Sequence, residues 1–176
     1  MSSFHQKMEM KGKINNILLR YCIAPCFVVF IAFFTFLLDL ATKTVSEVAV
    51  PNGALEVRGV DSFINIVNVQ NHGVMFGFFS SLFPSQLPFI VLQILITLTL
   101  FIWSISMQDI ASRIGVGLII GGAIGNTYDR IVRGYVLDFI DIHLTRYHYP
   151  AFNLADVAIV LGVILVYSRF SLSTAK

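Results

Sequence analysis

Four long apolar runs divide the chain into hydrophobic and polar segments. A transmembrane helix needs about 20 consecutive apolar residues to cross the roughly 30 Å hydrocarbon core of a bilayer. The runs that meet or approach this length cover residues 21–38, 87–107, 114–128 and 151–167. The third is short because an acid follows it, and the fourth contains an acid near its start. The pattern predicts four transmembrane helices.

Two polar segments connect these runs on one side of the membrane. Residues 41–86 are too many for a turn and too polar for lipid, so we expect a small exterior subdomain. Within it, residues 55–60 and 63–69 are rich in β-branched side chains and are flanked by Asn-Gly and Gly turn signals, which predicts short strands. Two strands alone are marginal in water, so they are expected to rest on the bilayer or on the helices. Residues 133–150, rich in Tyr, His and Arg, are expected to form a second exterior loop.

The composition agrees with a chain that folds mainly in lipid. Only 12% of the 176 residues are charged and 56% are hydrophobic, with a mean hydropathy of +0.79. A soluble domain carries about 25% charged residues because its surface must meet water, and a disordered chain is less hydrophobic still. The expected fold class is an all-α membrane protein of one domain, with four transmembrane helices and a small exterior β-sheet between the first two.

Charge and cysteine content exclude several classes of function. The net charge of +2 is scattered, without the basic stripe of a nucleic-acid surface, so no nucleic-acid partner is expected. Cys22 and Cys26 lie four residues apart, which matches neither a disulfide framework nor a CxxC pair, and we interpret them as packing residues. The four histidines show no metal-ligand spacing, so no metal site is expected.

Basic residues before the first run predict a cytoplasmic N-terminus under the positive-inside rule. They are Lys7, Lys11, Lys13 and Arg20. A cleavable signal peptide also begins with a basic segment, but its apolar part has about 7–15 residues, whereas this run is longer, lacks an A-x-A site and precedes three more runs. Four crossings return the C-terminus to the cytoplasm. The seven basic residues on that side compare with five outside, which are Lys43, Arg58, Arg130, Arg133 and Arg146.

The predicted organisation follows from this topology. A basic cytoplasmic arm covers residues 1–20, a single membrane domain covers 21–170, and a cytoplasmic tail covers 171–176. Within the membrane domain, the exterior β subdomain covers 41–86.

Half of the ten acidic residues lie at or beside the ends of the apolar runs, where an ionisable group is costly and functional by default. They are Asp39, Asp129, Asp138, Asp141 and Asp156. The predicted topology brings these ends to the outer face, while the inner ends carry Asp109 alone. We therefore expect one polar site in the outer leaflet.

Polar residues in the third run share one helix face. Asn126, Asp129 and Arg130 follow i, i+3, i+4 spacing, which places an amide, an acid and a base together. Two interpretations of Asp129 and Arg130 remain open: a local ion pair that ends the span while Arg130 reaches the interface, or the orientation of a substrate. Glycines that recur every four residues in line with Asp129 predict close helix packing. They are Gly117, Gly121 and Gly125.

Two aspartates can face each other across the last exterior loop. Asp138 and Asp156 lie on either side of a segment that reverses the chain. Two carboxylates in a site of low dielectric share a proton, so that one is base and the other acid, which suits hydrolysis of an amide. Asn153 and Asp156 also match a helix N-cap with an acid three positions on, where the helix dipole favours an ionised carboxylate. A catalytic pair, a proton relay and a helix cap remain open at this point.

Five short blocks stand in a fixed order along the chain. They read DLATK at 39–43, NHGVMFG at 71–77, GNTYDR at 125–130, VLDFID at 136–141 and FNLAD at 152–156. Together with the four apolar runs, they resemble the signature blocks of bacterial lipoprotein signal peptidase, the type II signal peptidase. The resemblance implies an aspartic endopeptidase of the bacterial inner membrane, with its site near the periplasmic face. Such an enzyme removes the signal peptide of prolipoproteins on the N-terminal side of a diacylglyceryl-modified cysteine.

The resemblance also implies roles for individual residues. Asp138 and Asp156 are expected to be the catalytic pair. Residues expected to line the site or to orient the substrate are Asn71, Asn126, Arg130 and Asn153, and those expected to support it are Asp39, Asp129 and Gly73. The family implies a lipidated prolipoprotein as substrate and no metal or organic cofactor. We also expect membrane lipid as surroundings and a monomer.

The segments around the site carry further expectations from the family. The segment before Asn71 is expected to form a small sheet that cradles the substrate, and the loop before Phe152 is expected to close over it. Residues 74–75 (Val-Met) and 149–150 (Tyr-Pro) depart from the family's usual residues at positions that shape the pocket and the loop.

Two other classes of function remain as alternatives. A proton-coupled transporter would use Asp129, Asp138 and Asp156 as a relay, and it predicts acids spread through the depth of the membrane. A scaffold protein would use Asp–Arg pairs only to anchor helix ends, and it would tolerate exchange of the carboxylates for amides.

Overall fold

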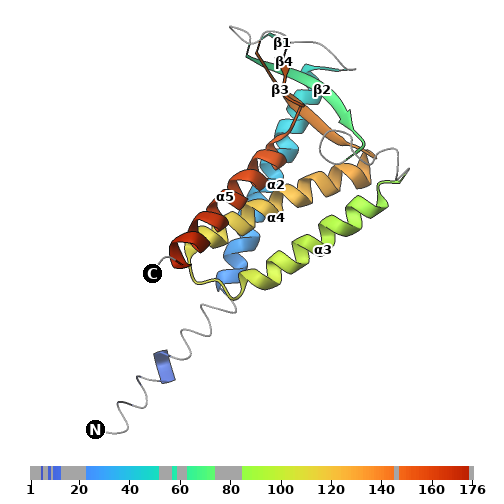
Figure 1. Ribbon diagram of the computed structural model, residues 1–176. Coiled ribbons are helices and arrows are strands. Elements are labelled where there is room, and N and C mark those ends of the chain that lie inside the picture. Colours follow the sequence, from blue (N-terminus) through green and yellow to red (C-terminus); the bar gives the residue numbers. More distant parts are fainter. Residues whose placement is uncertain are drawn as a thin grey trace.

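A bundle of four helices carries a small antiparallel sheet at one end (Figure 1). The computed structural model describes residues 5, 8, 10–12, 23–51, 57–58, 63–73, 85–144 and 147–174. The helices are α2 (Ala24–Ala49), α3 (Leu87–Ser104), α4 (Ile110–Val132) and α5 (Leu154–Thr174), and the strands are β1 (Val57–Arg58), β2 (Ile64–Asn71), β3 (Val136–Leu144) and β4 (Tyr147–His148). All four helices are long and apolar enough to cross a membrane. The predicted fold class, a mainly helical membrane protein with four apolar helices and a small sheet, is confirmed.

Two helices extend beyond the apolar runs that predicted them. The first run ends at residue 38 and the third at 128, but α2 and α4 both continue through charged residues. Those charges do not face lipid, because Lys43 and Asp129 are completely buried and pair with each other. A buried ion pair lets a helix continue where its sequence stops being apolar. The predicted ends of these two spans were therefore wrong.

The sheet has the strand order β1-β2-β3-β4, with every neighbouring pair antiparallel. The register of β2 and β3 places Asn65 opposite Asp141 and Val69 opposite Asp138, with an irregularity between Ile66 and Val69. The strand expected at 63–69 is confirmed as β2, and of the one expected at 55–60 the structure describes β1 at its centre.

The segment 133–150, expected to be a loop, is instead largely β-structure. It contains β3 and β4, and β3 supplies the long central partner of β2. Residues 136–139 at the start of β3 are all buried, so this part of the strand is covered on both faces. Pairing with β2, which is distant in sequence, satisfies the backbone groups that a loop would leave to water. Thus the sheet depends on a strand beyond the segment predicted to contain it.

Glycines allow α4 to pack closely against both α2 and α5. A methyl group on Gly121 would lie 2.5 Å from the main-chain oxygen of Ala32 on α2, and one on Gly122 would lie 2.5 Å from that of Ala155 on α5. Real Cβ atoms do not approach so closely, so these backbones touch only because the side chain is absent. The predicted packing role of the α4 glycines is confirmed. It also brings the polar end of α4 against α2 and α5.

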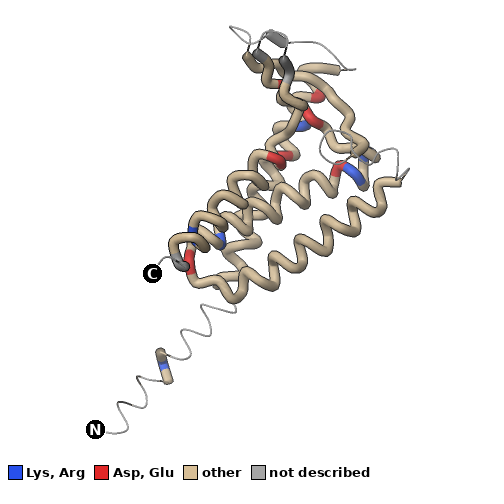
Figure 2. Tube along the Cα trace, viewed as in Figure 1, with Lys and Arg blue, Asp and Glu red and all other residues tan. Residues whose placement is uncertain are grey.

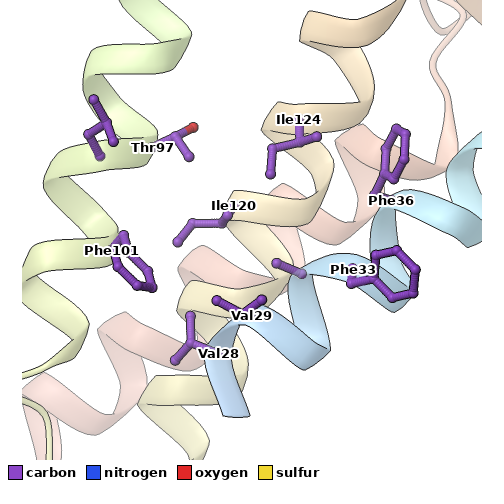
Figure 3. Close-up of a pocket in the computed structure, with 10 residues that line it drawn as sticks. Val28, Val29, Phe33, Phe36, Thr97, Phe101, Ile120 and Ile124 are labelled. Carbon is purple, nitrogen blue, oxygen red and sulfur yellow. The ribbon is translucent and has the colours of Figure 1, made fainter. Parts of the chain in front are cut away.

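An apolar pocket of about 340 Å³ lies between α2, α3 and α4 (Figure 3). Its walls include Val28, Phe36, Phe101, Ile120 and Ile124. No lining residue is ionisable. The pocket therefore has no group for acid–base chemistry, and the polar groups gather elsewhere in the bundle.

Candidate active site

Asp138 lies near the start of β3, buried between amide side chains. It is 2% exposed, and its two carboxylate oxygens accept from Nδ2 of Asn71 at 2.9 Å and from Nδ2 of Asn153 at 2.7 Å. Burial raises the pKa of Asp138 to about 6, because the ionised form loses its hydration, and the nearby charge of Asp156 adds to the rise. The hydrogen bonds from the two asparagines act against this increase in pKa. With a pKa of about 6, Asp138 takes up a proton at a higher pH than an ordinary aspartate does.

Asp156 lies in the first turn of α5, where the helix dipole favours negative charge. Its Oδ1 accepts from Nδ2 of Asn126 at 2.9 Å, and its Oδ2 accepts from the main-chain N–H of Asn153 at 3.3 Å. In return, the main-chain N–H of Asp156 donates to Oδ1 of Asn153 at 3.0 Å. The predicted N-cap, with its acid three positions on, is confirmed as a reciprocal capping arrangement.

Asn153 connects the two aspartates. It is completely buried, and its Nδ2 donates both to Asp138 and, at 3.1 Å, to Oδ1 of Asn126. One asparagine therefore caps α5, holds Asp138 through its side chain and holds Asp156 through its main chain. The cap and the pairing of aspartates coexist in one set of contacts, as the sequence allowed.

Lys43 is a part of this cluster that the sequence did not predict. Its Nζ lies 2.7 Å from Oδ2 of Asp39, 2.9 Å from Oδ2 of Asp129 and 3.2 Å from Oδ1 of Asn126. It was counted among the exterior basic residues, which was wrong, because the side chain is buried in the protein. The i, i+4 spacing of Asp39 and Lys43 on one helix was the signal that could have found it.

Asp39 and Asp129 tie the surrounding elements together. Oδ1 of Asp39 accepts from the main-chain N–H of Ala155 at 2.9 Å, which satisfies a free donor at the start of α5. Oδ2 of Asp129 accepts from the main-chain N–H of Leu137 on β3 at 3.2 Å, and Oδ1 pairs with Arg133 at 3.1 Å. The interpretation of Asp129 and Arg130 as a local ion pair at the end of the span is wrong, because Asp129 pairs with Lys43 and Arg133 and the helix continues.

Arg130 points into the protein and does not reach for the interface. It is 7% exposed, and its Nη1 donates to the main-chain oxygen of Asn126 and to Oε1 of Gln93, both at 3.2 Å. Its Nη2 donates to the main-chain oxygen of Gly73 at 3.1 Å, and the N–H of Gly73 in turn donates to Oδ1 of Asn71 at 3.0 Å. Arg130, Gly73 and Asn71 therefore form a connected group that ends on Asp138. Gln93 was not predicted, although an amide in an apolar helix was a visible signal.

Asp141 does not join the other span-end aspartates. It lies three positions after Asp138 on β3, and residues at odd spacing on a strand point to opposite faces. Its Oδ2 accepts from Nδ2 of Asn65 on β2 at 3.0 Å. Residues 74–75 lie outside the described part of the chain, whereas Tyr149 is exposed and its ring lies 6.0 Å from that of Phe152.

The cluster combines two neighbouring carboxyl groups with fixed amide donors and a buried guanidinium. Acidic and basic residues gather where the helices meet the sheet (Figure 2). Such a pair can hold one proton between two carboxyl groups, and can then deprotonate water while protonating a carbonyl oxygen. Among the described residues, no group of three His, Cys, Asp or Glu side chains is arranged to hold a metal ion.

Comparison with known proteins links this arrangement to one family. The family model described as "Signal peptidase (SPase) II" matches residues 31–171. A lipoprotein signal peptidase of Aquifex aeolicus is 37% identical over 142 residues, covering 80% of this chain and 83% of the relative. One of Thermodesulfovibrio yellowstonii is 38% identical over 134 residues, covering 76% of this chain and 86% of the relative.

Solved structures share the fold as well. A bacterial membrane enzyme determined by the in meso method at 2.3 Å resolution superposes with a TM-score of 0.71 at 28% identity, covering 84% of this chain and 88% of that one. A second, at 1.9 Å resolution, gives a TM-score of 0.68 at 27% identity, with coverage of 81% and 91%. The similarity therefore extends over most of the chain in both sequence and structure.

Proposed function

Because the chain belongs to the lipoprotein signal peptidase (signal peptidase II) family of aspartic peptidases, we propose that Asp138 and Asp156 are its catalytic pair. They cleave the signal peptide from a prolipoprotein on the N-terminal side of its diacylglyceryl-modified cysteine. The observation that carries this assignment is the bridge through Asn153, which donates to both carboxylates from one buried residue. A carboxyl pair held in this way is fixed in position before substrate arrives.

The two carboxyl groups divide the acid and base roles. Asp138 has the raised pKa, so it carries the shared proton, while Asp156 lies at a helix N-terminus and accepts two hydrogen bonds as a carboxylate. Asp156 removes a proton from water, whose oxygen bonds to the scissile carbonyl carbon. Asp138 donates its proton to the carbonyl oxygen. The proton on Asp156 then moves to the amide nitrogen and the C–N bond breaks. Asp138 takes back a proton from one hydroxyl group of the tetrahedral diol, which releases the carboxylic acid and the amine and restores the starting pair.

The neighbouring polar residues orient the two carboxyl groups and the carbonyl group of the substrate. Asn71 and Asn126 each donate to one catalytic oxygen, which fixes the direction of the remaining lone pairs. Arg130, buried beside them, is placed to bind a carbonyl oxygen of the substrate and to stabilise the negative charge that develops on it. Asp39 and Asp129 support the site from outside it. Asp39 accepts from the start of α5, and Asp129 accepts from β3 and pairs with Lys43.

The burial of two basic residues supports the proposed orientation in the inner membrane. The positive-inside rule concerns loop charges, and Lys43 and Arg130 are buried within helices. When Lys43 and Arg130 are left out of the count, the exterior basic residues are Arg58, Arg133 and Arg146. The excess of basic residues on the cytoplasmic side is then larger. The site then faces the periplasm, where water reaches the scissile bond while the lipid of the substrate stays in the leaflet. Contacts through Lys43, Asn126 and Asn153 join four aspartates in one group, namely Asp39, Asp129, Asp138 and Asp156. Such a compact group favours hydrolysis over a proton relay, which needs acids spread across the membrane.

Replacement of either catalytic carboxyl group by an amide tests the assignment. We expect Asp138→Asn and Asp156→Asn to lower kcat for a diacylglyceryl-modified prolipoprotein in detergent by about 10²–10⁴-fold, the usual contribution of general acid–base catalysis. Thermal unfolding of the purified variants should stay close to that of the parent protein. Cleavage is followed by the mobility of the product on a gel and by mass determination of the new N-terminus.

Asp141→Asn is the matched control, because Asp141 lies on the same strand but bonds to Asn65 away from the pair. It should retain activity within about threefold of the parent. Equal rates for the parent and for either Asp138→Asn or Asp156→Asn would refute the catalytic pair.

A further inference from the structure

α3 places two side chains, one helical turn apart, against the guanidinium of Arg130. Oε1 of Gln93 accepts from Nη1 at 3.2 Å, and the ring of Phe89 lies 5.8 Å from Cζ. Residues at i and i+4 share a helix face, so both contacts come from the side of α3 that packs on α4. We propose that Gln93 is a positioning residue, which holds Arg130 in the orientation that binds the scissile carbonyl. This inference rests on the proposed function.

The direction of the Gln93 amide follows from its partners. A guanidinium has only donors, so the amide must turn its oxygen toward Arg130. Oγ1 of Thr127 also lies 3.1 Å from the same oxygen, and 2.7 Å from the main-chain oxygen of Ala123, so these two acceptors share its single proton. Thr127 and Arg130 are three positions apart on the same face of α4, so one oxygen of Gln93 contacts both side chains. An apolar side chain at position 93 would leave the Arg130 donor without this acceptor in a buried site.

The acceptors that hold Arg130 are uncharged. Among the described residues they are the Gln93 side chain and the main-chain oxygens of Asn126 and Gly73. The carboxylates that attract the guanidinium electrostatically are Asp156, Asp138 and Asp129, yet no ion pair among the described residues joins Arg130 to them directly. A neutral acceptor therefore fixes the guanidinium while leaving its positive charge available to the reaction.

Of the five N–H groups of Arg130, three donate to Gln93, Asn126 and Gly73 among the described residues, which leaves the Nε–H and one N–H of Nη2 for the substrate. The Nε of Arg130 is buried and has no hydrogen-bond partner among the described residues. A buried N–H without an acceptor is unfavourable, and a carbonyl oxygen entering beside the catalytic pair would satisfy it. Gln93 and Asn126 accept from Nη1, and Gly73 accepts from Nη2. These contacts fix the plane of the guanidinium and therefore the direction of its Nε–H. Loss of Gln93 should thus affect how substrate binds and reacts more than whether the protein folds.

Kinetics of Gln93→Met test this role, because methionine has a similar length but no amide acceptor. We expect kcat/KM for the lipidated prolipoprotein to fall about tenfold, with a raised KM, because misplacement of a positioning group is costly. The matched control is Thr97→Val, which removes a polar group one turn further along α3 at the apolar pocket. It should remain within about twofold of the parent. Because Gln93→Met leaves one buried Arg130 donor without this acceptor, its Tm in detergent should fall modestly, whereas that of Thr97→Val should stay close to that of the parent.

Gln93→Glu separates positioning from charge. Glutamate keeps an acceptor for Arg130, so KM should return close to the parent value, while kcat stays lower because the added carboxylate offsets the guanidinium charge. Activity of Gln93→Met equal to that of Thr97→Val would overturn the proposal, as would a KM for Gln93→Glu as high as for Gln93→Met. If Gln93→Met does not fold, Phe89→Leu takes its place, with a raised KM expected and an unchanged KM counting against the proposal.

The same assays distinguish this inference from the function on which it rests. A parent protein that cleaves, together with an inactive Asp138→Asn, supports the proposed function whatever Gln93→Met does. Parent-like kinetics of Gln93→Met in that setting would refute only the positioning role. Absence of cleavage by the folded parent would refute both.

Discussion

Lys43 determines, through one buried ammonium group, how several polar side chains of the site are arranged. It lies between Asp39 and Asp129 and touches Oδ1 of Asn126. Because an ammonium group only donates, Asn126 must turn its oxygen to Lys43 and its Nδ2 to Asp156. The orientation of the hydrogen bond from Asn126 to Asp156 thus depends on a charge that makes no hydrogen bond to Asp138 or Asp156 among the described contacts.

Lys43→Met should be strongly destabilising. It leaves Asp39 and Asp129 buried without their shared cation, and breaking a buried ion pair by removing one partner costs about 3–5 kcal/mol. The free energy of unfolding, measured by denaturant titration in detergent, reports this loss. Thr44→Val, at an exposed position next along α2, is the control and should change stability by less than about 0.5 kcal/mol.

A second substitution identifies the cause of that loss. Asp129 keeps its ion pair with Arg133, so Asp39 is the carboxylate that Lys43→Met leaves without a cation among the described residues. Asp39→Asn added to Lys43→Met removes this charge, so the double variant should be more stable than Lys43→Met alone. A double variant that is less stable, or a loss below about 1 kcal/mol for Lys43→Met, would contradict the account of a buried charge network.

At the scale of elements, α4 is the helix on which the site is assembled. Its glycine face brings it against α2 and α5, and its last turns carry Asn126, Asp129 and Arg130 into the space between them. Gly125 has a direct role, because a Cβ there would collide with the carboxylate of Asp39. Helix packing and site geometry are therefore controlled by the same face of one helix.

Gly121→Ala should separate α2 from α4 and disturb the site at a distance. The new methyl group would lie 2.5 Å from both the main-chain oxygen of Ala32 and Cβ of Thr35, so the backbones must move. We expect at least about tenfold lower cleavage activity and a lower Tm. Ile131→Ala, at a residue that is 64% exposed on the same helix, should leave both unchanged. An unaltered rate for Gly121→Ala would show that the close approach of the helices is not needed.

At the scale of the whole molecule, the sheet lies at one end of the bundle (Figure 1), and the polar cluster lies at that end because two of its residues, Asn71 and Asp138, are on β2 and β3. β2 and β3 carry Asn71 and Asp138 to the start of α5, while the loop between α3 and α4 lies at the opposite end. The molecule thus has the candidate site at one end and the loop between α3 and α4 at the other. In the proposed orientation, the end with the candidate site faces the periplasm.

Cysteine labelling in cells tests that orientation. In a variant with Cys22 and Cys26 replaced by serine, Tyr149→Cys at the sheet end should react with a membrane-impermeant maleimide in spheroplasts. Gln108→Cys, in the loop between α3 and α4, should react only after the membrane is permeabilised. Both parent residues are exposed, so accessibility of the side chain does not limit the reaction. The reverse pattern would place the site on the cytoplasmic side.

The sequence by itself determined what depends on local spacing and on solvent. Apolar run length predicted four helices, because crossing a bilayer requires a fixed length of apolar chain. The Asn153–Asp156 cap was predictable because its partners are three residues apart, and the α4 glycine face because four-residue spacing repeats on one side of a helix.

Only the tertiary structure decided which distant charges pair. Asn126 is 83 positions from Lys43, and no periodicity within a helix indicates such a contact. The strand β3 was predicted as a loop because its stability comes from pairing with β2, which is a non-local interaction. Burial then reversed the interpretation of Lys43 and Arg130, since a charged residue between helices is held by partners that only the folded chain brings together.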